Sequence, residues 1–221
     1  SDFNSDLILA YVTIRDKLEK LIESLENHSK NYHKNSTEYY YQVRKQEPKQ
    51  QIEKVSRLIF LNRTCFNGLY RVNKKGQFNV PLGRYTNPNI VNKENLNAVS
   101  KILQSEKIKI LCRGFEAVLD DTTKGDLVYF DPPYQPISNT ANFTSYTHRN
   151  FTEDDLQRLV DLANKLNSKG CHVLLSNSNS KTVKDYFSEK HWSISEIKAN
   201  RAINSNSKKR TGHKEIIIKN Y

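Results

Sequence analysis

The chain has 221 residues, with 35 Lys and Arg, 24 Asp and Glu, and a formal net charge of +11. This length is enough for one α/β domain with a core of its own and a small insert. The three cysteines are far apart and have no CxxC spacing, and no apolar run reaches the roughly 20 residues of a membrane span, which argues against a metal site and a membrane protein.

The first elements expected along the chain are helices. Six apolar residues recur near the N-terminus at intervals of four and three: Leu7, Tyr11, Ile14, Leu18, Leu21 and Leu25. This spacing predicts one helix with an apolar face over residues 6–26. The polar residues 29–50 are expected to be a connector or the start of an inserted region, and 51–65 a second helix.

Residues 67–81 contain two short β-prone runs around Asn73-Lys74-Lys75-Gly76, which predicts a hairpin. A basic hairpin with aromatic side chains could enter a DNA groove. An ordinary surface hairpin would have the same pattern, so the function of this segment stays open at this point.

From residue 92 onward, helical and strand patterns alternate. Helices are expected at 94–104, 115–120, 152–168 and 181–189, and strands at 108–112, 126–130, 171–176, 192–198 and 215–219. Thr152, with Asp155 three residues later, is typical of a helix N-cap. This alternation predicts an α/β fold with a doubly wound sheet, in which ligands bind at the C-terminal ends of the strands.

Asp131-Pro132-Pro133-Tyr134 directly follows the apolar strand pattern of 127–130. A carboxylate and a backbone carbonyl can each accept one N–H of an exocyclic amino group, and the two prolines stiffen the turn that presents them. An aromatic ring beside them offers a surface for a flipped base. The alternative is a simple strand-ending turn, because Pro-Pro commonly ends a strand.

The basic residues are unevenly distributed. Residues 41–86 contain ten Lys or Arg against two acidic residues, and residues 198–214 contain six and none. Two basic segments on either side of a candidate base pocket indicate a polyanionic partner.

Several segments, in this order, carry a resemblance to a known family: 2–7, 61–63 continuing to Tyr85, 131–134, 140–144, 175–177 and 201–206. The chain resembles the Dam-type, D12-class DNA adenine-N6 methyltransferases, particularly those acting at GATC, over nearly its whole length. The resemblance implies a cytoplasmic enzyme of bacterial, archaeal or phage type. It would use S-adenosylmethionine, release S-adenosylhomocysteine and need no metal. A restriction endonuclease for the same site could accompany it.

The resemblance also implies roles for single residues. Asp131 and Pro132 would hold the target amine, and Tyr134 would stack on the base. Asp2 would bind the ribose hydroxyls of the cofactor, with Gly114, Phe115 and Asp131 as its other contacts. The expected DNA contacts are Phe66, Asn67, Leu69, Arg71, Pro81, Arg84, Tyr85, Asn142, Asn206 and Lys208.

Within that set, Phe66 takes the place of an aromatic residue that wedges into the duplex. Leu69 and Pro81 suit contact with a thymine methyl group, and Arg71 suits bidentate contact with guanine. For Arg84 and Tyr85 a solvated surface is an equally good interpretation.

Two departures from the family pattern bear on the cofactor. The glycine-rich loop that should precede Asp2 is absent, so the chain is expected to be a fragment that lacks the cofactor-loop strand. Arg113-Gly114 stands where many relatives carry an acidic residue that contacts the adenine of the cofactor. A catalytically silent DNA-binding module is therefore the alternative, and an N4-cytosine methyltransferase, which more often has Ser in place of Asp131, is a third interpretation.

The fold expected is a Rossmann-like methyltransferase sheet with a helical and hairpin DNA-recognition insert. Residues 1–44 and 91–221 would form the catalytic domain, and 45–90 the target-recognition insert. The predicted reaction transfers a methyl group to adenine N6 in double-stranded DNA, within GATC, on a flipped base.

Overall fold

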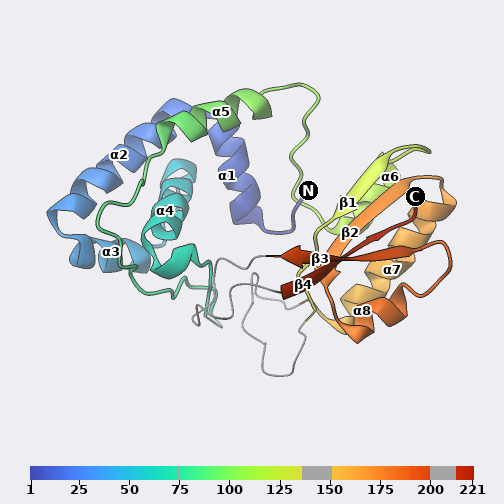
Figure 1. Cartoon of the computed structure of the whole chain (residues 1–221). Coiled ribbons are helices and arrows are strands. Elements are labelled where there is room, and N and C mark those ends of the chain that lie inside the picture. Colours follow the sequence, from blue (N-terminus) through green and yellow to red (C-terminus); the bar gives the residue numbers. More distant parts are fainter. Residues whose placement is uncertain (74, 136–150, 200–212) are drawn as a thin grey trace. The chain divides into compact units, whose positions relative to one another are not determined.

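The computed structural model describes residues 1–73, 75–135, 151–199 and 213–221. The chain forms two compact units, one of Ser1–Gly114 and one that begins at Phe115 (Figure 1). Each unit has its own hydrophobic core. This division records packing and not function, so the predicted boundaries of a catalytic domain and a recognition insert stay a prediction.

The first unit is helical. Its elements are α1 (Ser5–Asp16), α2 (Leu18–Lys34), α3 (Ser36–Lys45), α4 (Gln51–Thr64), the 3-10 turn η1 (Phe66–Gly68) and α5 (Lys93–Leu103). The Asn4 side chain caps α1 by accepting from the backbone N–H groups of Asp6 and Leu7. The predictions of helices over 51–65 and 94–104 are confirmed.

Two predictions for this unit are wrong. The helix expected over 6–26 is two helices, because the chain leaves helical geometry at Lys17 (φ −139°, ψ 37°). The Lys17 and Thr13 side chains both bond to Gln51 of α4, which ties the junction down. The connector expected over 29–50 is mostly helix, since Tyr40 and Val43 bury an apolar face of α3 that the polar composition concealed.

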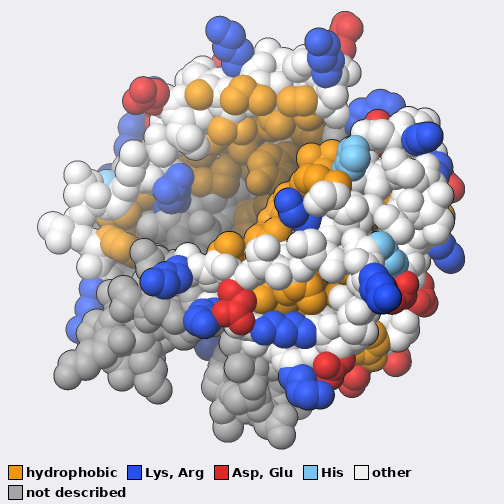
Figure 2. All heavy atoms as spheres, turned by 45° about the vertical axis from the view of Figure 1, so that its right-hand side comes forward, with side chains coloured by type: hydrophobic (Ala, Val, Ile, Leu, Met, Phe, Trp, Pro, Cys, Tyr) orange, Lys and Arg blue, Asp and Glu red, His pale blue; other side chains and the backbone are white. Residues whose placement is uncertain are grey.

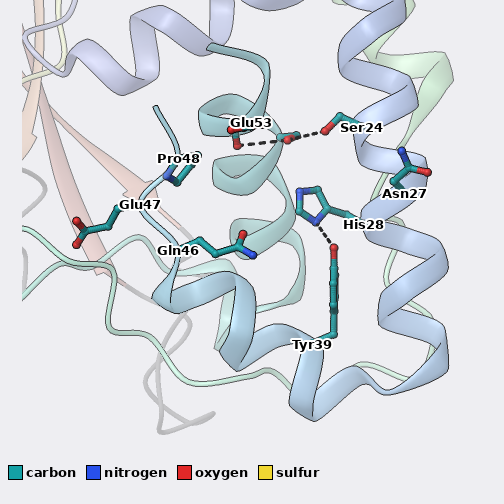
Figure 3. Close-up of a pocket in the computed structure, with 9 residues that line it drawn as sticks. Ser24, Asn27, His28, Tyr39, Gln46, Glu47, Pro48 and Glu53 are labelled. Atoms are coloured by element: carbon teal, nitrogen blue, oxygen red, sulfur yellow. Dashed lines mark hydrogen bonds between the residues drawn. The ribbon is translucent and has the colours of Figure 1, made fainter. Parts of the chain in front are cut away.

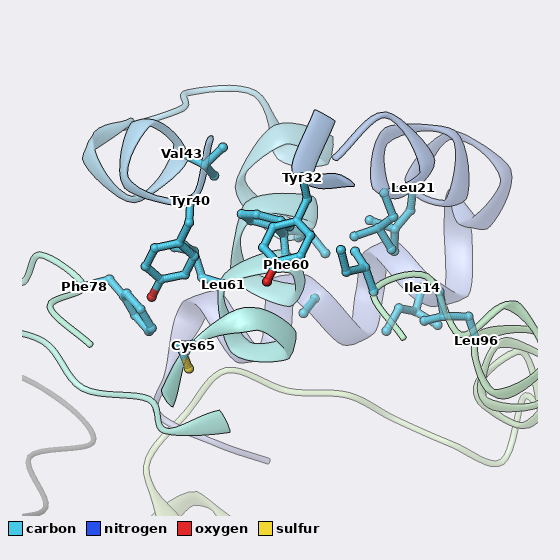
Figure 4. Packing of buried hydrophobic residues seen from close by; sticks show 14 of the residues in the cluster. Ile14, Leu21, Tyr32, Tyr40, Val43, Phe60, Leu61, Cys65, Phe78 and Leu96 are labelled. Atoms are coloured by element: carbon cyan, nitrogen blue, oxygen red, sulfur yellow. The ribbon is translucent and has the colours of Figure 1, made fainter. Parts of the chain in front are cut away.

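The core of the helical unit includes residues of each of the helices α1 to α5. Phe60 and Tyr32 pack at its centre, and Tyr40 lies beside Leu61 and Phe78 (Figure 4). The Tyr32 and Phe60 rings meet edge to face, with 5.9 Å between centroids, a geometry that aromatic pairs favour.

The second unit is α/β. Its elements are η2 (Phe115–Ala117), α6 (Val118–Asp121), β1 (Leu127–Phe130), α7 (Glu153–Ser168), β2 (His172–Ser178), α8 (Lys181–Tyr186), β3 (Ser193–Ala199) and β4 (His213–Lys219). The predicted capping of α7 by Thr152 is confirmed, and Asp155 completes a capping box. The strand expected at 108–112 is wrong: its one recorded pairing is a parallel bridge between Cys112 and Asp2.

The four strands among the described residues form one sheet in the order β1-β2-β4-β3. β1 and β2 are parallel, and β4 runs antiparallel to both of its neighbours. The α/β methyltransferase class expected from the sequence is confirmed, but the sheet is mixed and not purely parallel.

The two faces of this sheet differ. Val128 and Phe130 of β1 are buried together with the apolar side of α7. Leu127 and Tyr129, which alternate with them, are 60% and 56% exposed. Apolar side chains remain visible at the surface of the protein in Figure 2. Within the described part of the chain, no helix is both long and apolar enough to cross a membrane.

Candidate active site

The Asp-Pro-Pro-Tyr turn begins where β1 ends, at the C-terminal edge of the sheet. Asp131 is exposed, and its Oδ1 accepts a hydrogen bond of 2.7 Å from the hydroxyl of Ser176 on the neighbouring strand β2. Ser176 is only 5% exposed. The carboxylate is therefore open to a substrate on one side and anchored to a strand on the other.

Tyr134 is the last residue of the turn. Its hydroxyl donates to Oε2 of Glu215 on β4 at 3.3 Å. Burial raises the pKa of Tyr134 above its ordinary value; a hydrogen bond with Ser176 opposes this, and the neighbouring carboxylates Glu215 and Asp131 add to it. Tyr134 therefore stays a neutral phenol, as a ring that stacks on a base requires.

The backbone after the turn is held by β2. Asn177 accepts from the N–H of Gln135 at 3.2 Å, and Ser178 donates to the carbonyl of Gln135 at 2.7 Å. The Nδ2 of Asn177 is buried without a hydrogen-bond partner among the described residues. The resemblance had marked 175–177 only as a segment, and nothing in the sequence indicated Ser178 or Glu215.

The predicted cofactor residues are divided between the two units. In the first, Asp2 bonds through its backbone to Leu111 and Arg113, and its Oδ1 accepts from the N–H of Asn4 at 2.7 Å. Gly114 ends this unit, and Phe115 begins the other, where it lies 6.5 Å from Phe151 between ring centroids. Asp2 is exposed, and no described residue bonds to its Oδ2, so one oxygen can still accept from a ligand hydroxyl.

The predicted DNA-contacting segment, residues 66–85, starts after α4. Phe66 and Tyr85 are 43% and 42% exposed, which leaves both rings accessible to a partner. The N–H of Phe66 donates to the carbonyl of Pro81 at 2.8 Å, so the two ends of the segment are joined. The expected hairpin is reduced to one antiparallel bridge, between Val72 and Phe78.

The ends of this segment meet closely at Gly83. Its N–H donates to the carbonyl of Thr64 at 2.8 Å. A Cβ at Gly83 would lie 2.7 Å from the carbonyl oxygen of Cys65 and 2.4 Å from the Tyr85 ring, so no larger residue fits without a shift. Asn67 has a positive φ of 56°, a conformation that Asn tolerates better than most residues.

Arg71 is exposed on this segment, and its Nε donates to Oδ1 of Asn79 at 2.8 Å. The bond holds the guanidinium by its inner nitrogen and leaves the two terminal nitrogens for other acceptors. Leu69 is packed against the helical core, and Arg84 is exposed.

Part of the basic segment 41–86 is structural. Arg57 donates to the backbone carbonyls of Val43 and Arg44, and Arg44 donates to that of Val80. Burial lowers the pKa of Arg57 below its ordinary value. These two arginines hold the backbone together, so the number of basic residues overstates the number available for phosphate.

Asn142, Asn206 and Lys208 lie outside the described residues, so their predicted DNA contacts stay predictions. Among the residues that the structure describes, no cluster of three His, Cys, Asp or Glu side chains could hold a metal ion.

A pocket of about 500 Å³ lies in the helical unit (Figure 3). His28 is at its wall, where its Nδ1 bonds to the Tyr39 hydroxyl at 2.8 Å. Burial lowers the pKa of His28 to about 4, so this imidazole is neutral. The acidic side chains of the wall are Glu47 and Glu53, and no described Lys or Arg lines it, which suits an anionic substrate such as DNA poorly.

Comparison with known proteins first defines the class. The chain matches the family described as D12 class N6 adenine-specific DNA methyltransferase over residues 1–203. The chain belongs to this family, and it is a DNA adenine-N6 methyltransferase.

Individual relatives agree with this assignment. A type II methyltransferase of Lactococcus lactis subsp. cremoris is 44% identical over 227 residues, covering 100% of this chain and 78% of the relative. A type II methyltransferase of Methanocaldococcus jannaschii is 41% identical, covering 100% and 79%. A DNA adenine methylase of Escherichia coli is 30% identical, covering 98% and 77%.

Proposed function

We propose that the chain methylates adenine N6 within GATC in double-stranded DNA, with S-adenosylmethionine as donor and with the target base turned out of the helix. The observation that carries the proposal is the Asp131 carboxylate, exposed at the C-terminal end of β1 and anchored through Ser176. An adenine inside a duplex cannot reach a carboxylate of this kind without leaving the stack.

In this proposal Asp131 and the carbonyl of Pro132 accept the two N–H bonds of the amine. The lone pair of the exocyclic N6 amine is delocalised into the adenine ring, and two hydrogen-bond acceptors favour electron density on this nitrogen. S-adenosylmethionine supplies an electrophilic methyl group. The nitrogen would gain that methyl as the methyl–sulfur bond breaks and S-adenosylhomocysteine leaves, and it would give up one proton to Asp131. Tyr134 stacks on the base while Glu215 holds its hydroxyl.

Asp2 fits the donor molecule on chemical grounds. Ribose offers hydroxyl donors, and the carboxylate of Asp2 is an acceptor whose Oδ2 is not used by any described residue. Gly114 and Phe115 would add backbone and ring contacts. Since two relatives are named type II methyltransferases, we also propose a restriction endonuclease of the same specificity as its functional partner, without direct contact.

The test is Asp131→Ala in the full-length protein. Initial rates with tritiated S-adenosylmethionine are measured on a GATC duplex and on duplexes with one base pair changed, beside DNA binding and donor calorimetry. We expect near-complete loss of transfer with DNA binding retained, while Asp161→Ala, which removes an exposed carboxylate on α7, stays active. Activity of Asp131→Ala within threefold of the parent would exclude the catalytic role.

Two other outcomes would change the conclusion. A parent protein that binds DNA but shows no calorimetric binding of S-adenosylmethionine would be a silent DNA-binding module. Equal rates on GATC and altered duplexes would retain the adenine chemistry and reject the GATC specificity.

A further inference from the structure

Ser176 contacts three side chains of β1 and its turn, namely Tyr129, Asp131 and Tyr134. Its Oγ lies 2.7 Å from Oδ1 of Asp131 and 3.1 Å from the hydroxyl of Tyr129. Tyr129 and Asp131 are two residues apart. Because side chains alternate between the two faces of a strand, residues i and i+2 lie on the same face, and so do these two. Ser176 belongs to the neighbouring strand β2 and thus joins them across the sheet.

The direction of these bonds follows from proton count. A serine hydroxyl carries one proton, and an ionised carboxylate can only accept. Ser176 therefore donates its proton to Asp131, and Tyr129 must be the donor in its contact with Ser176. The result is a chain of donation from Tyr129 through Ser176 to Asp131.

This chain has a consequence for the carboxylate. Oδ1 of Asp131 is occupied by Ser176, while Oδ2 receives no hydrogen bond from any described residue. Ser176 is 5% exposed and lies within a paired strand, so water competes poorly for its proton and its position is stiff. The bond limits rotation of the carboxylate and presents Oδ2 outward.

We propose that Ser176 is a positioning residue for adenine methylation, which holds the Asp131 carboxylate in the orientation that accepts the amine, and that Tyr129 orients Ser176. This inference rests on the proposed role of Asp131. Neither hydroxyl is assigned a contact with DNA or donor, and Tyr134 keeps its bond to Glu215 without Ser176, so removal of either hydroxyl slows transfer and leaves substrate binding essentially unchanged.

The experiment compares Ser176→Ala, Tyr129→Phe and the double variant in the full-length protein, with tritiated S-adenosylmethionine and a GATC duplex. For Ser176→Ala we expect kcat to fall about 10- to 100-fold with KM for DNA essentially unchanged, the effect of losing one hydrogen bond to a charged group. Tyr129→Phe should lower kcat less, and it should add nothing in the Ser176→Ala background, because its effect passes through Ser176.

The matched control is Ser195→Ala, which removes an exposed serine hydroxyl from β3 of the same sheet and should keep the parent kcat. Thermal melting checks the fold of each variant. If Ser176→Ala lowers the melting temperature, Tyr129→Phe gives the same test, because Tyr129 is 56% exposed and its substitution disturbs the core little. A lower kcat at constant KM in Tyr129→Phe supports the inference, and an unchanged kcat overturns it.

The failures of the two proposals are distinguishable. An active Asp131→Ala removes the proposed function. An inactive Asp131→Ala beside a Ser176→Ala that matches Ser195→Ala keeps the proposed function and overturns the positioning role. Additive effects of Tyr129→Phe and Ser176→Ala, or a loss confined to KM, also overturn it.

Discussion

Tyr40 donates its hydroxyl to the carbonyl oxygen of Val80 at 2.8 Å, and its side chain is fully buried. The same oxygen accepts from Arg44 at 3.1 Å. Burial raises the pKa of Tyr40 above its ordinary value, so the phenol remains a donor at any physiological pH. This contact fastens the end of the predicted DNA-contacting segment to helix α3.

Tyr40→Phe should therefore destabilise the protein by about 1–3 kcal/mol, because the buried acceptor loses one of its donors. Urea unfolding measures the change. Tyr41→Phe, on the same helix but not fully buried, is the control and should change stability by much less. Equal effects of the two substitutions would show that the bond to Val80 contributes nothing of its own.

Arg71→Ala should remove discrimination at one guanine of the site, by about 1–3 kcal/mol if the contact is bidentate. Asn79→Ala should cause a smaller loss at the same base pair, because it releases the Nε of Arg71 without removing the charge. Binding to GATC and single-substituted duplexes measures both.

The control for Arg71 is Lys75→Ala, an exposed cation of the same segment. Lys75→Ala should weaken binding to all DNA sequences alike. It should also reduce the slope of log affinity against log salt concentration by about one unit. If Arg71→Ala behaves in that same way, Arg71 contacts phosphate and the predicted base contact is wrong.

The cysteines should differ in reactivity. Cys112 is exposed, whereas Cys65 and Cys171 are buried, and burial raises the pKa of Cys65 to about 11. At pH 8 a thiol reagent should label Cys112 fast and Cys65 slowly, since the thiolate is the reacting form. Peptide mass spectrometry at successive times measures the labelling rate of each cysteine, and unfolding in urea should abolish the difference between these rates. Fast labelling of Cys65 in the native protein would contradict the packing of α4.

His28 should make stability depend on pH. Its folded pKa is about 4, below the ordinary 6.5, so the unfolded chain binds more protons between these values. Stability is thus fully present above pH 6.5 and falls towards pH 4, by at most about 1.4 kcal/mol per pH unit. Urea unfolding at pH 5 and 7 should show a smaller difference for His28→Phe.

His33→Gln is the control for that experiment. His33 is exposed, and its bond to the carbonyl of Ser29 raises its pKa, the opposite direction. The variant should therefore keep the loss of stability in acid. An unchanged acid loss in His28→Phe would assign the effect to other groups.

Local sequence determined much of the fold. The strand before Asp131 and the cap at Thr152 were predictable, because a short apolar run, two prolines or one hydroxyl acts on its immediate neighbours. The family resemblance then supplied the proposed roles of Asp131 and Tyr134, since the residue pattern alone was also compatible with a plain strand-ending turn.

Tertiary packing decided the rest. At the helix break, Lys17 bonds to Gln51, 34 residues away, and Arg57 bonds to backbone carbonyls more than ten residues away. Ser176 meets Asp131 across 45 residues of chain because β2 pairs with β1 in one particular register. Hydrogen bonds of this kind join groups that only a folded chain brings within reach, and the periodicity of a sequence records which face is buried but not which partner lies opposite.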